Sequence, residues 1–109
     1  MSRSTLQLPA VVDKDSLLQA FAGHCGFTEH FGYNWDALWD SLGDWLEAQD
    51  MPFCLEVDGS RIRQLNVPDW QICQEILDDA CAEWPEFTYR LTGWPDPLSP
   101  EGESSGQPG

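Results

Sequence analysis

Apolar residues recur at helical spacing in three segments of the chain. Within residues 35–47 they fall at i, i+3, i+4 and i+7, which predicts an amphipathic helix. The same spacing within residues 69–83 predicts a second long helix, and residues 17–22 predict a shorter one that ends near His24. All three patterns leave one polar face, so each helix is expected to pack on a shared core.

Three short stretches rich in β-branched and other apolar residues predict strands at residues 5–12, 53–57 and 87–91. The order of elements is then strand, helix, helix, strand, helix, strand. Strands separated by helices favour βαβ units, which require parallel pairing. The sequence therefore predicts an α/β fold in which a small three-stranded parallel sheet packs with three to four helices.

Capping and turn residues separate these elements. Asp13 or Asp15 can cap the first helix, and Asn34 is a favourable N-cap for the second. Glycines within residues 23–33 predict a loop, and residues 60–66 are expected to form a helical turn.

The 109 residues fit one folded domain, which we expect to span residues 1–92. Residues 93–109 are rich in Pro, Gly, Ser and acidic residues and lack periodicity, so a disordered tail is predicted there. The first residues lack the apolar core of a signal peptide, and a cytoplasmic location is expected.

The charge balance is strongly acidic, with 19 Asp and Glu against 5 Lys and Arg and a formal net charge of −14. Such a surface repels nucleic acid and anionic membranes, so neither is an expected partner. It attracts basic proteins and speeds encounter with them. Solubility alone is the competing explanation of the same excess.

No metal or cofactor is expected. The four cysteines form no CxxC pair, and reduced, buried thiols are the simplest interpretation. His24, Cys25 and His30 are close in sequence, but their spacing matches no zinc pattern. Gly-rich phosphate loops and nucleophile–base motifs are also missing.

Four acids share one face of the helix predicted at residues 35–47, because Asp36, Asp40, Asp44 and Glu47 are spaced by 4, 4 and 3 residues. Like charges at this spacing repel, and no Lys or Arg between Lys14 and Arg61 offsets them. Local inconsistency of this kind is typical of functional sites. A face held ready for a cationic partner and a merely solvated face both remain open at this point.

Three tryptophans lie on the same helix: Trp35, Trp39 and Trp45. Tryptophan beside carboxylates is typical of interface hot spots. We expect Trp45 or Trp35 to pack inward and Trp39 to lie at the boundary between core and surface.

Residues 31–45, FGYNWDALWDSLGDW, closely resemble the motif region of the barstar family, intracellular inhibitors of the ribonuclease barnase. Residues 79–91 resemble the end of that family's last helix and its final strand. The resemblance covers about residues 5–92. The matching motif positions are Phe31, Gly32, Asn34, Asp36, Ala37, Leu38, Trp39, Asp40, Leu42 and Trp45.

The resemblance implies that the loop and second helix enter the nuclease active site, where RNA phosphate is normally held. Asp40 would then be the central carboxylate that pairs with active-site arginines, Asp36 would flank it, and Asp79 would supply an outlying acid. The family's complex is itself a standard example of charge steering and of an interface hot spot. The other contact or supporting positions are His30, Asn34, Trp35, Trp39, Asp44 and Trp45.

The chain departs from the family pattern at several of these positions. His30 stands where the family's major member has a contacting tyrosine, which could make binding pH-sensitive; an ordinary exposed loop histidine is the alternative. Trp35 replaces a smaller apolar residue, and Asp79 replaces a glutamate. These departures concern the identity of the partner more than the fold.

The sequence thus predicts a non-enzymatic inhibitor of a basic, barnase-like ribonuclease, monomeric when free. An immunity protein of the same fold against a different basic toxin is the first alternative. An enzyme would need carboxylates facing across a cleft, whereas Asp36 and Asp40 lie one turn apart on the same helix. A scaffold whose acidic face binds nothing specific is the remaining alternative.

Overall fold

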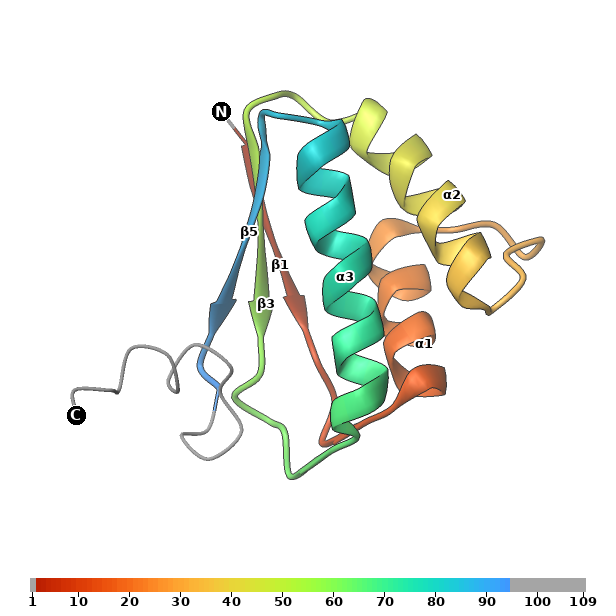
Figure 1. Cartoon of the computed structure of the whole chain (residues 1–109), viewed down its shortest axis with the longest axis vertical. Helices are drawn as coiled ribbons and strands as arrows, with labels where there is room; N and C mark the ends of the chain where they lie inside the picture. The colour runs from red at the N-terminus through yellow and green to blue at the C-terminus, as the bar shows by residue number, and fades with distance from the viewer. Residues whose placement is uncertain (1, 95–109) are drawn as a thin grey trace.

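Three parallel strands form the sheet on which the helices pack: β1 (Ser2–Gln7), β3 (Phe53–Asp58) and β5 (Phe87–Thr92). Their order is β1-β3-β5, so β3 is central and hydrogen-bonded on both sides. This computed structural model describes residues 2–94 (Figure 1). The predicted three-stranded parallel sheet is confirmed.

All three helices lie on one side of this sheet (Figure 1). They are α1 (Lys14–Cys25), α2 (Trp35–Glu47) and α3 (Val67–Glu83). The predicted α/β class is therefore confirmed, and residues 2–94 form three of the predicted three to four helices. Each βαβ connection crosses on the same face, so within residues 2–94 the opposite face of the sheet carries no helix.

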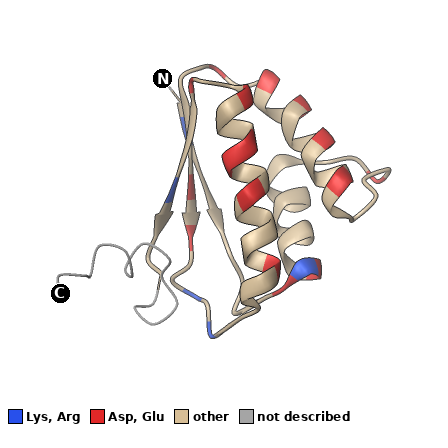
Figure 2. Ribbon diagram, in the orientation of Figure 1, with Lys and Arg blue, Asp and Glu red and all other residues tan. Residues whose placement is uncertain are grey.

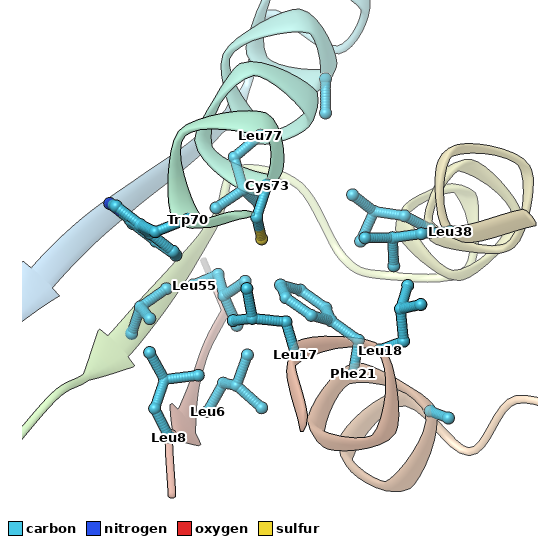
Figure 3. Packing of buried hydrophobic residues seen from close by; sticks show 14 of the residues in the cluster. Leu6, Leu8, Leu17, Leu18, Phe21, Leu38, Leu55, Trp70, Cys73 and Leu77 are labelled. Carbon is cyan, nitrogen blue, oxygen red and sulfur yellow. The ribbon is translucent and has the colours of Figure 1, made fainter. Parts of the chain in front are cut away.

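The core fills the space between the sheet and the helices. Alternate residues of β3 are buried, namely Phe53, Leu55 and Val57, because successive side chains of a strand point to opposite faces. Residues from all three helices meet them (Figure 3). Burying each large apolar side chain contributes about 1.5–3 kcal/mol to stability, which makes this layer the main stabilising feature. The residues labelled there are Leu6, Leu8, Leu17, Leu18, Phe21, Leu38, Leu55, Trp70, Cys73 and Leu77.

The helix caps follow local chemistry. Asp13, not Asp15, caps α1, and its carboxylate accepts a hydrogen bond from the backbone N–H of Ser16 at 2.9 Å. The same helix ends at Gly26, whose φ of +70° suits a residue without a side chain. The loop predicted from residue 23 therefore begins at residue 26, and Gly23 lies inside the helix.

The strand predicted at residues 5–12 is wrong at both ends, because β1 spans Ser2–Gln7. Pro9 has no backbone N–H to continue the ladder, and the chain bends before a separate strand, β2 (Val11–Val12). This strand pairs in parallel with β4 (Gln64–Leu65).

The prediction of a helical turn at residues 60–66 is also wrong at residues 64–65, where β4 forms. The backbone N–H groups of Arg63 and Gln64 donate to the carbonyl oxygen of Ala10, and that of Asn66 donates to Val12. These bonds to a distant segment replace the local ones that a helical turn would make. Asn66 then caps α3, which begins at residue 67 and not at residue 69.

The carboxyl end of the domain is fixed by Trp94. Its indole N–H donates to the carbonyl oxygen of Val57 at 3.0 Å, and its ring lies 4.8 Å from that of Trp70. Ordered packing thus continues two residues beyond the boundary predicted at residue 92. The rest of the predicted tail, residues 95–109, lies outside the described residues. Within residues 2–94, no helix is long and apolar enough to cross a bilayer.

Candidate protein-binding face

A fully buried leucine stripe fixes the orientation of α2. Leu38, Leu42 and Leu46 have 0% exposure and pack into the core. Gly43 lets the helix approach its neighbour closely, because a Cβ atom there would lie 2.9 Å from Cη2 of Trp84. The side of α2 opposite this stripe is therefore held outward by close packing.

The outward side carries the four acids that the spacing predicted to share a face. Asp36, Asp40, Asp44 and Glu47 are all exposed, and Figure 2 shows acidic bands repeated along α2. Within residues 2–94, none of the four takes part in an ion pair. Their charges are free to meet a partner, since no base of this domain neutralises them.

The helix begins at the cap predicted from the sequence. The side-chain oxygen of Asn34 accepts a hydrogen bond from the backbone N–H of Ala37 at 2.8 Å, and its amide donates to the carbonyl of Gly32. With its side chain engaged in the cap, Asn34 supports the first turn of α2. Asp36 lies in that turn, where the helix dipole favours a negative charge.

The three tryptophans of α2 are all half-buried, and both expectations are confirmed: Trp45 is the one that packs inward, and Trp39 lies at the boundary between core and surface. Trp45 does pack inward, with its ring 5.3 Å from Phe53 and 5.9 Å from His24. Trp39 packs on Trp84 at 6.1 Å. Trp35 faces α3 instead of the sheet, where it lines a groove between the two helices.

That groove has a volume of about 600 Å³ and runs between α2 and α3. It brings Asp79 of α3 together with Trp35, Asp36 and Trp39 of α2, four of the predicted site residues. Asp40 lies one helical turn beyond Asp36 on the same outward face. The groove is lined by apolar side chains and carboxylates together, which suits long side chains with a cationic head.

The structure adds groove residues that sequence reasoning missed. They repeat at helical spacing along α3, on the face next to the buried stripe of Trp70, Cys73 and Leu77. That offset pattern is visible in the sequence and could have identified them. They are Ile72, Glu75, Ile76, Ala82 and Glu83.

Five of the predicted residues do not line the groove: Asn34, Asp40 and Trp45, described above, and also Asp44 and His30. Asp44 lies further along α2, and His30 is an exposed residue of the loop between α1 and α2. The backbone N–H of His30 donates to Thr28 at 3.3 Å. Tyr33 in this loop also escaped prediction: it is 51% exposed, has a positive φ of 53° and lies with its ring 4.8 Å from Phe31. An exposed aromatic held in an unusual backbone conformation extends the surface next to α2.

His24 has a structural environment and does not converge with Cys25 and His30 on a metal site. Its Nε2 atom and the hydroxyl of Ser4 are joined by a hydrogen bond of 2.6 Å, and burial lowers the pKa of its imidazole. Among residues 2–94, no three His, Cys, Asp or Glu side chains come together in a way that could hold a metal ion.

The fold and this face define a small α/β domain that presents an acidic, tryptophan-bearing helix on its surface. A family model described as Barstar (barnase inhibitor) matches residues 1–93. The chain therefore belongs to the barstar family. Members of the family are inhibitors and not enzymes, and inhibition of a barnase-type ribonuclease is the function that membership implies. No curated protein matches the chain.

Proposed function

We propose that this protein inhibits a basic, barnase-like ribonuclease by placing α2 in its active site. The observation that carries the proposal is the exposed row of Asp36, Asp40 and Asp44, which no base of residues 2–94 pairs. A ribonuclease active site holds cationic groups to bind RNA phosphate, and carboxylates on a rigid helix can occupy the same positions.

Asp40 is the centre of the proposed contact. It is exposed, follows Trp39 and lies one turn from both Asp36 and Asp44. A planar guanidinium can pair with its two oxygens at once, which fixes orientation as well as adding free energy. Asp36 and Asp79 flank the groove beside it and would meet further cations of the partner.

A competition experiment tests this mode of binding. An oligonucleotide that occupies the nuclease active site without being cleaved should raise the apparent Kd of the protein in proportion to its own concentration. Simultaneous binding of both ligands would show that α2 does not occupy the phosphate sites, and would overturn the proposal.

A second candidate function keeps the fold and changes the target. The positions occupied by Trp35 and His30 differ from the family pattern, and Trp35 forms part of the groove. Differences at a contact surface alter which partner binds best. An immunity protein against another basic toxin would meet these criteria, and the basic protein that co-purifies with the chain in its own cell distinguishes the two.

We also propose that the protein works in the cytoplasm as a monomer. Its four cysteines, Cys25, Cys54, Cys73 and Cys81, are all unpaired, which suits a reducing compartment. Cell fractionation tests the compartment, and sedimentation of the free protein over a range of concentrations tests the monomeric state.

A further inference from the structure

The face of the sheet turned away from the helices collects side chains that the proposed function does not use. The register places Arg3, Cys54 and Thr88 in one row across β1, β3 and β5. Thr5, Glu56 and Arg90 form the next row. Figure 1 shows no helix on this side.

The two arginines of this face have hydrogen-bonding capacity left over. Nη1 of Arg3 and Nη1 of Arg90 lie 3.7 Å and 3.9 Å from the same oxygen of Glu56. Both distances exceed those of a hydrogen bond, and one carboxylate cannot satisfy two guanidinium groups with five donors each. The side chains are 66% and 63% exposed, so an incoming carboxylate can reach both.

The arginines border a hollow of about 600 Å³ at the amino ends of the strands. Pro52, Phe53 and Pro85 also line this hollow, which has room for a peptide segment beside the charged groups. Figure 2 shows acids in bands along α2 and α3 and also on β3, whereas basic residues lie on the outer strands, at the lower loops and at the start of α1. At this sheet face Arg3 and Arg90 offset the carboxylates of Glu56 and Glu86, so an acidic segment is repelled less there than over α2 or α3.

The chain itself supplies an acidic segment at a suitable place. Residues 95–109 contain Asp96, Glu101 and Glu103 and no Lys or Arg. The preceding residue, Trp94, is fixed at the carboxyl end of β3 by its bond to Val57. Fifteen residues can span about 50 Å, whereas a six-residue strand covers about 20 Å, so this segment can reach both arginines.

We propose that the open sheet face binds the acidic segment of residues 95–109 through Arg3 and Arg90. The prolines of this segment lack the N–H groups needed to extend the β5 edge as a further strand, which favours contact with the face. Single exposed ion pairs are weak, but a tethered segment has a millimolar effective concentration. Bound in this way, the segment shields the sheet face and Cys54 from solvent.

Cys54 provides the reporter for this proposal, because it shares a row with Arg3 and is partly exposed. Cys73 is fully buried, and burial raises the pKa of Cys25 to about 12 and also raises that of Cys81. Thiolates are the reactive form, so these raised pKa values slow the reaction of Cys25 and Cys81 with a neutral alkylating reagent. Mass spectrometry of the modified peptide identifies the site.

The experiment uses the full chain in a double-mutant cycle. Neutralising the segment (Asp96→Asn, Glu101→Gln and Glu103→Gln) should speed alkylation of Cys54 by about threefold, a modest effect because such ion pairs are weak. In the background of Arg3→Gln and Arg90→Gln, the same three changes should have no effect. High salt should speed alkylation of the unaltered chain and leave the neutralised chain unchanged.

The proposal would be overturned if the neutralised segment accelerated alkylation of Cys54 equally with and without the two arginines. It would also be overturned if there were no acceleration in the chain that keeps both arginines. Acceleration that disappears on dilution would also overturn it, because the acidic segment would then belong to another copy of the chain. The salt comparison requires no arginine variant, and the result does not depend on any nuclease. Failure here is therefore distinguishable from failure of the proposed inhibition.

Discussion

At the scale of single residues, Asp40 has the surroundings expected of a central contact. It is exposed, lies on a helix whose opposite side is fully buried, and has neighbours of the same charge one turn away on either side. A partner cation that binds there interacts with three carboxylates at once, because Asp36 and Asp44 lie on the same face. The cost of their mutual repulsion in the free protein is relieved by binding.

Replacing Asp40 by Ala should therefore weaken binding far more than replacing Asp44. Removing one member of a desolvated charge pair costs about 2–5 kcal/mol, which is about 30-fold or more in Kd. An exposed acid at the edge of the contact contributes about 1 kcal/mol or less. Isothermal titration of both variants against the nuclease measures the difference, and equal losses would contradict the assignment of Asp40 as the centre.

His24 should make stability depend on pH. Because burial lowers its pKa below the usual 6.5, the folded state holds the imidazole neutral while the unfolded chain takes up a proton as pH falls. This contribution to stability is complete above the unfolded pKa and is lost as pH decreases below it. Replacing His24 by Gln should reduce the loss of stability between about pH 7.5 and about pH 5.5.

Urea unfolding of both chains at the two pH values checks this prediction, since every group other than residue 24 is common to both chains and cancels in the difference. If the free energy of unfolding falls by the same amount between the two pH values in both chains, His24 is not responsible for the loss.

The site residues of α2 could be predicted because their signals are local. Asn34 is a cap, the acids follow helical spacing, and the motif around Asp36 and Asp40 is specific. The helical spacing of Glu75 on α3 was visible in the sequence, but its place beside α2 depends on how the two helices pack. Tyr33 was missed because no local rule places a bulky residue at positive φ.

At the scale of elements, α2 is positioned by close contact with the corner between α3 and β5. Gly43 is the point of closest approach, where Trp84 occupies the space that a side chain would need. The indole of Trp84 also packs on Trp39, so this contact supports the same helix that carries the acids.

A pair of glycine substitutions tests this contact. Gly43→Ala should destabilise the protein by about 1–3 kcal/mol, because the new Cβ would lie 2.9 Å from the Trp84 ring. The matched control is Gly23→Ala in α1, where no atom lies within 4 Å of the added Cβ. That change should stabilise the protein by about 0.5–1 kcal/mol through helix propensity. Urea midpoints give both values, and stabilisation by both substitutions would rule out tight packing at residue 43.

The elements that sequence predicted best are those with both a cap and a long stripe. The bounds of α2 agree with the expected residues 35–47, because Asn34 begins the helix and the leucine stripe runs its full length. The short strands β2 and β4 could not be foreseen, since each has only two residues and exists through hydrogen bonds to the other. The misplaced start of β1 has a similar cause, because pairing with β3 determines it.

At the scale of the whole molecule, charge is segregated. The acids of α2 and α3 occupy one side, and the five basic residues lie on the strands, on the loops that follow β3 and at the start of α1 (Figure 2). This separation gives the molecule an oriented field that presents α2 to a basic partner. The net charge was evident from the sequence, but its distribution depends on which face of the sheet the helices cover.

The association rate should consequently fall as salt is added, while the dissociation rate changes little. Neutral variants of Asp44 and Glu47, which lie at the far end of α2, should lower the association rate and weaken its salt dependence. Stopped-flow mixing over a range of ionic strength measures both rates. A dissociation rate that carries the whole salt effect would contradict long-range steering.

Enzyme inhibition tests whether the acidic face of α2 blocks a ribonuclease active site. The most direct measurement is RNA cleavage by barnase-like ribonucleases titrated with the protein, with Asp40→Ala as the control. Activity of the cognate enzyme should fall to zero near one equivalent of the protein, and the variant should leave cleavage largely intact at the same concentration. Inhibition by the variant as strong as that by the unaltered chain would contradict blocking by this face.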